Sequence, residues 1–156
     1  MIPKFRAWIK DYQVMRSVEF LAFNEKGVAE VFTNPIDGEP EDFRNVHVPK
    51  QIILMQSTGL KDCNDKEIYE GDILKVYSRN VDEEKKYLII VAWDEEAGAY
   101  TTKELWGNEE AAKLGWDTTD SYIVTNIGWE IKASDMLFEV VGNIYENPEL
   151  LEEVSK

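Results

Sequence analysis

The segment from Thr58 to Leu74, with the sequence TGLKDCNDKEIYEGDIL, constrains the fold more than any other part of the chain. It contains a polar turn, Asp62 to Asp65, followed by the run EIYEGDILKVY from Glu67 to Tyr77. Gly71 lies inside that run, and glycine within a strand pattern usually marks a bulge or a corner. The segment therefore predicts a hairpin with a corner at Gly71.

Alternating apolar residues predict further short strands. In the run from Lys4 to Lys10, Phe5, Ala7 and Ile9 recur at period two, which favours a strand over a helix. The residues Asn24 to Gly27 separate two apolar runs and can supply the positive-φ positions of a hairpin turn. Strands are expected over Val18–Phe23, Val28–Thr33, His47–Thr58, Lys86–Trp93, Ala99–Leu105, Tyr122–Ile131 and Leu137–Tyr145. Short strands separated by turn signals favour a barrel or a sandwich.

Two short helices interrupt this pattern. Asn108 as an N-cap, early glutamates and Gly115 after the last apolar residue predict a short internal helix. Asn147 and Pro148 predict the start of a C-terminal helix that extends to Val154. The expected fold is therefore mainly β, with one short internal helix and one C-terminal helix.

The loop from Asn34 to Asp42, NPIDGEPED, contains two prolines, a glycine and four carboxylates, so it is expected to be exposed. It separates a small N-terminal β unit, residues 1–45, from residues 46–156. The N-terminal unit is expected either to stand by itself or to belong to the same domain as the rest.

Three blocks of sequence resemble the YopX-like proteins of bacteriophages and prophages. They are KFRAW at Lys4 to Trp8, LMQSTGLKDCNDKEIYEGDIL at Leu54 to Leu74, and FEVVGNIYENPELL at Phe138 to Leu151. One departure from the family pattern is visible, because relatives usually have an Asn-Gly pair where this chain has Asn64-Asp65. Asparagine and aspartate tolerate left-handed conformations better than other non-glycine residues, so the hairpin is expected to form at a small cost.

The resemblance implies a mainly β protein, encoded by a phage genome, whose C-terminal part is similar to an SH3-type barrel or roll. It implies no established activity and brings no catalytic residues to this chain.

The charge of the chain is strongly and unevenly acidic. The sequence has 31 acidic and 17 basic side chains, a formal net charge of −14. Residues up to Leu60 contain 7 basic and 8 acidic side chains, so the segment from Lys61 onward contains 10 basic and 23 acidic. A phosphate backbone binds to positive surfaces and releases counterions there. Direct nucleic-acid binding is therefore not expected.

The expected location is the cytosol of a bacterial cell. The start of the chain, MIPKFRAWIK, lacks the apolar region of a signal peptide, and the longest apolar run, Leu88 to Trp93, is too short to span a membrane. The single cysteine, Cys63, cannot form an internal disulfide, which agrees with a location in the cytosol.

An acidic cluster around the polar turn raises the possibility of a metal site, because hard cations bind oxygen ligands. Its members are Asp62, Asn64, Asp65, Glu67, Glu70 and Asp72. An EF-hand loop starting at Asp62 would require other residues at Lys66, Glu67 and Ile73. We therefore expect a solvated turn, followed by a strand whose charged side chains point outward, without a metal ion.

The sequence offers little support for other catalytic chemistry. His47 and Cys63 are each the only residue of their kind, and a zinc site needs about four such ligands. A Cys–His nucleophilic pair has no activating sequence around Cys63. No G-x-S-x-G, P-loop or G-x-G-x-x-G motif is present, so no catalytic residue and no cofactor is predicted.

The tryptophans divide into two groups. Trp8 and Trp93 lie within strand patterns and are expected in the core. Trp106 and Trp116 bracket the expected internal helix in a polar region, and exposed aromatic residues are enriched at binding hot spots. They are the candidate contact patch, and the alternative is that they seal the end of a barrel.

Three functional hypotheses follow. The first is a non-catalytic accessory protein of a phage that binds a protein partner and forms a homo-oligomer, since edge strands must be paired or protected. The second is an acidic DNA mimic that occupies a host nucleic-acid-binding protein. The third is a metal-assisted hydrolase, which would need Asp62, Glu70 or Asp72 to converge in a concave pocket.

Overall fold

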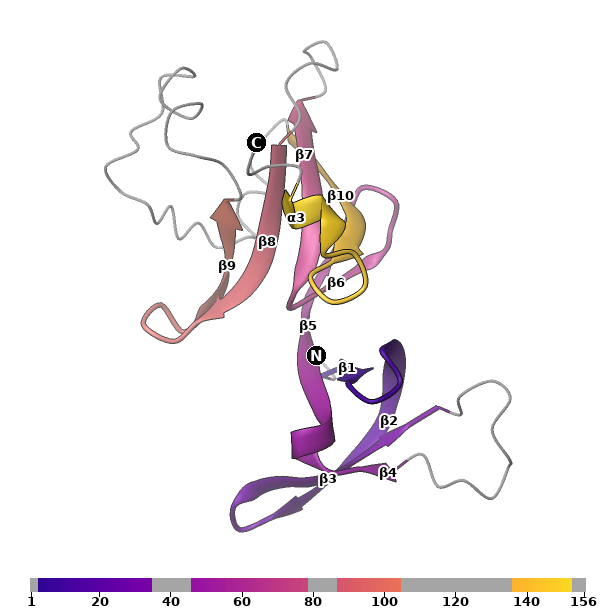
Figure 1. The fold of residues 1–156 in the computed structure, drawn as a ribbon. Coiled ribbons are helices and arrows are strands. Elements are labelled where there is room, and N and C mark those ends of the chain that lie inside the picture. The colour runs from indigo at the N-terminus through magenta and orange to yellow at the C-terminus, as the bar shows by residue number, and fades with distance from the viewer. Residues whose placement is uncertain (1–2, 35–45, 79–86, 105–135, 153–156) are drawn as a thin grey trace. The chain divides into compact units, whose positions relative to one another are not determined.

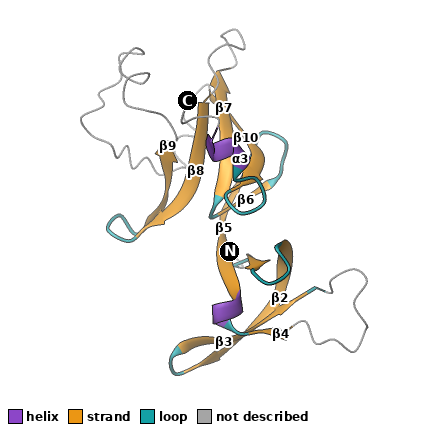
Figure 2. Ribbon diagram, in the orientation of Figure 1, coloured by secondary structure: helices purple, strands orange, loops and turns teal. Residues whose placement is uncertain are grey.

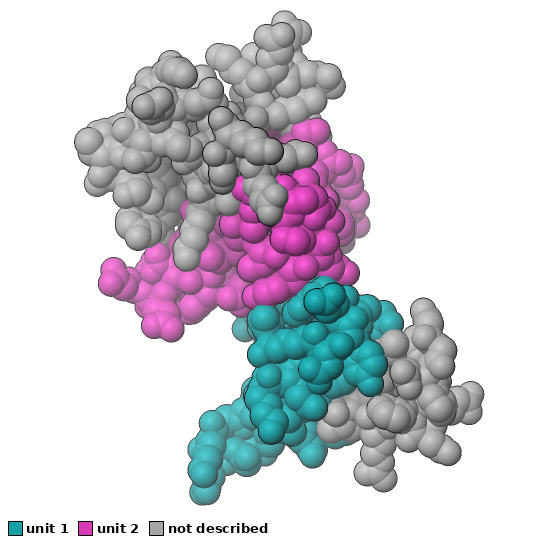
Figure 3. All heavy atoms as spheres, in the orientation of Figure 1, with its two compact units in different colours: residues 1–57 teal, residues 58–156 magenta. Residues whose placement is uncertain are grey.

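The computed structural model describes residues 3–34, 46–78, 87–104 and 136–152. The chain divides into two compact units, Met1–Ser57 and Thr58–Lys156 (Figure 3). The boundary expected after residue 45 falls at the end of segment 35–45, which is outside the described residues, and stays a prediction.

The first unit is an antiparallel sheet with the strand order β4-β3-β2-β1-β5 (Figure 1). Its elements are β1 (Phe5–Ile9), β2 (Val14–Asn24), β3 (Gly27–Thr33), β4 (Val46–His47), the 3-10 turn η1 (Pro49–Gln51) and the first part of β5 (Ile52–Lys61). The unit boundary at Ser57 lies inside β5, so this strand contributes residues to both units.

The core of the first unit follows the period-two pattern of β1. Ala7 and Ile9 are buried, and Ile9 lies opposite Val14 of β2 and Ile52 of β5. Val31 of β3 completes the buried cluster. Successive side chains of a strand point to opposite faces, so the alternation seen in the sequence placed these residues correctly.

The second unit contains a four-stranded antiparallel sheet and a hairpin. The sheet has the order β10-β7-β8-β9, with β7 (Asp72–Ser78), β8 (Tyr87–Asp94), β9 (Ala99–Glu104) and β10 (Met136–Asn143). The end of β5 pairs with β6 (Glu67–Tyr69), and Leu60 and Ile68 from these two strands pack in the core of the unit. The buried members of that core are Ile68, Leu74, Val76, Ile89, Val91, Phe138 and Val140.

The fold is mainly β, as expected (Figure 2). Neither sheet closes into a barrel within the described residues. The C-terminal helix is present as α3 (Glu149–Glu152), which follows Pro148 as the sequence predicted. The internal helix expected after Asn108 and the strand expected at Tyr122–Ile131 lie outside the described residues.

The prediction that Trp93 belongs to the core is wrong. Trp93 is 46% exposed, whereas Ile89 and Val91, which face the same side of β8, are buried. The core cluster ends at Val91 and the half-buried Tyr100, so Trp93 continues the apolar row beyond the last packed layer. Trp8, the other tryptophan expected in the core, is half-buried.

Candidate functional site

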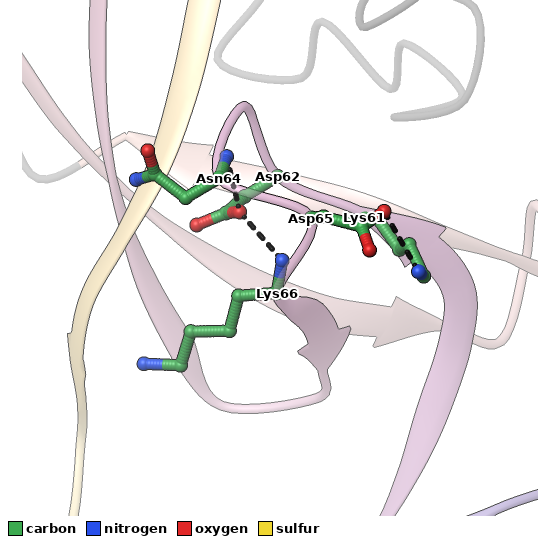
Figure 4. Close-up of polar contacts among 5 residues, drawn as sticks. All are labelled: Lys61, Asp62, Asn64, Asp65 and Lys66. Atoms are coloured by element: carbon green, nitrogen blue, oxygen red, sulfur yellow. Dashed lines mark hydrogen bonds and ion pairs between the residues drawn. The ribbon is translucent and has the colours of Figure 1, made fainter.

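The polar turn between β5 and β6 is built around the Asp62 carboxylate (Figure 4). Its Oδ1 accepts the backbone N–H groups of Asn64 at 2.8 Å and Lys66 at 2.9 Å. Its Oδ2 accepts the backbone N–H of Val140 in β10 at 2.9 Å. Asp62 is only 8% exposed, so both oxygens serve the fold. A carboxylate bound to backbone N–H groups makes charge-assisted hydrogen bonds, which are stronger than neutral ones.

The remaining residues of this turn face the solvent. Asp65 adopts a left-handed conformation with φ 67°, so the turn forms with aspartate in place of the glycine usual in the family. Its carboxylate lies 2.7 Å from Lys61 Nζ, but both side chains are largely exposed. Exposed ion pairs contribute little to stability. The expectation of a hairpin that tolerates the Asn64-Asp65 pair is confirmed.

A second junction surrounds Gly71, at the corner between β6 and β7. Gly71 has φ 80°, donates its N–H to Val91 O at 2.8 Å, and accepts the N–H of Ile144 at 3.0 Å. Next to it, buried Asp72 accepts the Tyr69 N–H through Oδ2 at 2.8 Å. The corner predicted at Gly71 is therefore confirmed, and it connects three segments of the second unit.

A third junction follows β10. Buried Asn143 accepts the N–H groups of Tyr145 at 3.0 Å and Glu146 at 2.9 Å, and its own N–H donates to Asn147 Oδ1 at 3.3 Å. A Cβ at Gly142 would lie 2.5 Å from that same Oδ1. A side chain at position 142 would therefore force the Asn147 side chain to shift.

The residues of the proposed acidic cluster do not act together, because they have different partners in the structure. Asp62 and Asp72 bind backbone groups in two different turns, and Asp65 pairs with Lys61. Over the described ranges, no three His, Cys, Asp or Glu side chains form a group that could hold a metal ion. Glu70 lies near Tyr100 instead. Burial raises the pKa of the Tyr100 hydroxyl, and the charge of Glu70 raises it further.

His47 and Cys63 belong to different units of the chain. His47 is buried in the first unit, where its Nε2 lies 3.4 Å from Thr33 Oγ1 and burial lowers its pKa. Cys63 is exposed in the second unit, and its backbone N–H donates to Phe138 O at 2.9 Å.

The first unit presents exposed aromatic side chains on the β2–β3 hairpin. Phe20 is 55% exposed and stacks on Phe32 with the ring centroids 3.8 Å apart. Phe23 is 67% exposed. The ladder shifts register between Val18 and Phe20, so Leu21 packs on the core while Phe20 faces the opposite side. The second register shift adds its extra residue to β3, so β2 alternates regularly from Phe20 to Phe23 and Phe23 lies on the other face from Phe20. Sequence reasoning missed the stacked pair Phe20 and Phe32, which we name the phenylalanine patch.

The second unit presents its own exposed aromatic side chain, Trp93. Its ring forms an edge-to-face pair with Tyr100, its cross-strand partner in β9, with centroids 5.0 Å apart. The tryptophans proposed as a contact patch, Trp106 and Trp116, lie outside the described residues and stay a prediction.

The sequence matches the family model described as YopX protein over residues 4–152. This chain belongs to the YopX family. Among the solved structures similar to it are two from bacteria. Protein EF1440 from Enterococcus faecalis has 27% sequence identity and a TM-score of 0.63, with 97% of this chain and 99% of that chain covered. Protein yopX from Bacillus subtilis has 20% identity and a TM-score of 0.55, with 94% and 96% covered, which supports the shared fold. No curated protein matches the sequence.

The blocks by which this chain resembles the YopX family contain the three junctions. Asp62 and Gly71 lie in the central block, and Asn143 lies in the last one. Their hydrogen bonds hold β5, β6, β8 and β10 together within the second unit. In this YopX protein the family signature is thus explained by folding, and the exposed aromatic residues lie on other segments. Among the described residues, no helix is long and apolar enough to cross a lipid bilayer.

Proposed function

We propose that this YopX protein is a non-catalytic β module that binds other proteins and assembles with copies of itself. The observation that carries the proposal is the phenylalanine patch. The Phe20 ring is more than half exposed and stacks on Phe32 in a fixed cross-strand arrangement. Rigid, exposed aromatic groups lose little conformational entropy when they are buried, so they are frequent anchors of protein interfaces.

The buried polar residues support the non-catalytic part of the proposal. The Asp62 carboxylate is occupied by three backbone N–H groups, and Asn143 is occupied by the turn that follows β10. Groups held in this way stabilise turns and have few lone pairs left for a substrate. A phage origin and a cytosolic location are part of the same proposal, and Trp106 and Trp116 stay a predicted contact patch.

Self-assembly is tested by size-exclusion chromatography with light scattering over a range of protein concentrations, in reductant to keep Cys63 reduced. The wild type is expected to form a closed oligomer, and Phe20→Ser is expected to shift toward monomer. Tyr12→Ser is the matched control, because Tyr12 is 49% exposed in the same unit but lies in the β1–β2 turn. A wild type that remains monomeric at high concentration contradicts self-assembly.

Binding of a different protein is tested by affinity capture from the cells that express this protein. The wild type, Phe20→Ser and Tyr12→Ser are compared side by side. A partner retained by the wild type and the control but lost with Phe20→Ser supports the proposal. A partner retained equally by all three would assign binding to another surface.

We also propose that the second unit is an SH3-type roll. Support comes from the β5–β6 hairpin, whose Leu60 and Ile68 pack on the core residues of the four-stranded sheet. The backbone hydrogen bond from Cys63 to Phe138 O brings the hairpin turn against the edge strand β10. A crystal structure that leaves this edge of the unit open would contradict the proposal.

A DNA mimic is the second candidate function. It is favoured by the distribution of charge, because the second unit contains 10 basic and 23 acidic side chains and the first unit 7 and 8. Rows of carboxylates can imitate the phosphates of a duplex. In this case a captured partner would be a nucleic-acid-binding protein and would be displaced by duplex DNA. A partner indifferent to DNA contradicts the mimic.

A further inference from the structure

The core-facing side of β8 and β9 continues past the packed core. Ile89 and Val91 are buried on this side of β8, and Trp93 is the next residue on the same side. Its cross-strand partner Tyr100 packs against the core, but Trp93 does not belong to the cluster. The edge-to-face contact with Tyr100 fixes one edge of the indole and leaves 46% of the residue exposed. The result is a preformed apolar surface at the end of the hairpin.

The surroundings of this surface are acidic. Glu70 acts electrostatically on the hydroxyl of Tyr100, which places a negative charge beside the inner end of the aromatic pair. At the outer end, Asp94, Glu95 and Glu96 form the β8–β9 turn directly after Trp93, and both glutamates are exposed. Asp94 Oδ1 accepts the N–H groups of Glu96 and Ala97 at 2.9 Å, so the turn is well formed. The unit as a whole has 13 more acidic than basic side chains.

We propose that the Trp93–Tyr100 pair is a docking site for a lysine- or arginine-bearing segment of a partner protein. The apolar stem of a lysine or arginine packs against the exposed indole, and the cationic end lies beside the exposed glutamates of the β8–β9 turn, while Glu70 adds negative charge at the inner end of the pair. Tryptophan is the best aromatic surface for a cation, and long basic side chains combine an apolar stem with a charged tip. Acidic segments are repelled by this surface, and neutral apolar segments gain no electrostatic attraction from its carboxylates.

This inference rests on the proposed role as a protein-binding module, and it assigns a second surface of defined partner chemistry. The phenylalanine patch and the Trp93–Tyr100 pair belong to different units, so their variants separate the two proposals. Loss of self-assembly in Phe20→Ser reports on the first proposal alone, and peptide binding at Trp93 reports on the second.

The test uses the full chain, isotopically labelled, and a short unstructured peptide in which lysines flank a leucine. Two matched peptides carry acetylated lysines or glutamates in place of the lysines. Binding is followed through the indole N–H of Trp93 and the backbone amides of β8 and β9 in nitrogen–proton correlation spectra. The lysine peptide is expected to shift these signals, more weakly as salt is raised, and the two matched peptides are expected to leave them unchanged.

Trp93→Leu keeps an apolar side chain but removes the aromatic surface, and it is expected to weaken binding about tenfold. Glu70→Gln is expected to weaken binding about threefold. Phe23→Ala, a change at an exposed aromatic residue of the first unit, is the control and leaves the affinity unchanged. Spectra of each variant without peptide verify the fold.

Three results would overturn the proposal. They are equal binding of the acetylated peptide, unchanged affinity in Trp93→Leu, and no binding of the lysine peptide at millimolar concentration. Shifts that map to the acidic residues of the second unit but spare Trp93 would assign the peptide to unspecific charge attraction, which also overturns it.

Discussion

The two units of the protein bury different kinds of polar group. Among the described residues, the buried polar side chains of the first unit are Thr33, His47 and Ser57, and those of the second are Asp62, Asp72, Thr101 and Asn143. The second unit therefore contains buried carboxylates that organise turns. A buried carboxylate is tolerated only when hydrogen bonds replace its water. We infer that the first unit is held by apolar packing on paired strands, and the second also by specific polar junctions.

The largest change in stability is expected when the junction at Asp62 is removed. Asp62→Ala removes three hydrogen bonds to backbone N–H groups and is expected to lower the free energy of unfolding by about 3 kcal/mol. Urea-induced unfolding, followed by circular dichroism, measures the change. The matched control is Asp65→Asn, which removes the exposed ion pair with Lys61 and is expected to change stability by less than about 0.5 kcal/mol. Equal effects of the two variants would refute a special role for Asp62.

A smaller effect is expected at Gly142. The added methyl of Gly142→Ala would collide with Asn147 Oδ1, so we expect a loss of about 1–3 kcal/mol in the free energy of unfolding. The double-mutant cycle with Asn147→Ala sharpens the test, because the second change removes the colliding atom. Gly142→Ala should cost much less in that background. A cost that is independent of Asn147 would point to backbone conformation as the reason for the glycine.

The smallest effect concerns His47 in the first unit. Burial lowers the pKa of His47 below its ordinary value of 6.5, so the unfolded chain binds a proton more readily than the folded protein. The linked stability is present above pH 6.5 and is lost as the pH falls through the lowered pKa. We expect the stability difference between wild type and His47→Gln to shrink on acidification. Thermal unfolding of both proteins across this range measures it, and parallel pH profiles would contradict the argument.

Local patterns predicted much of the fold. Period-two alternation located the buried residues Ala7 and Ile9, and the glycine within a strand pattern located the corner at Gly71. These features depend on residues that are neighbours in the sequence, because a strand alternates its faces and a corner needs a positive φ. The acidic residues of the turn and of the following strand were expected to face solvent, but Asp62 and Asp72 are buried.

The candidate surfaces could not be predicted in the same way. Trp93 lies on the same face of β8 as the buried residues Ile89 and Val91. Alternation along a strand shows which side chains share a face, but it does not show where the layer that covers this face ends. Phe20 is exposed because the ladder shifts register after Val18, and nothing in the apolar run announces that shift.

The sequence by itself determined the mainly β architecture, the turn at Asp62–Asp65 and membership of the YopX family, because strand periodicity, turn residues and family motifs are local properties of the chain. Only the tertiary structure decided that Asp62 binds Val140, 78 residues further along, and that Phe20 and Trp93 face solvent. The physical reason is that burial and long-range hydrogen bonds depend on which layer covers a strand, and that layer is supplied by distant segments.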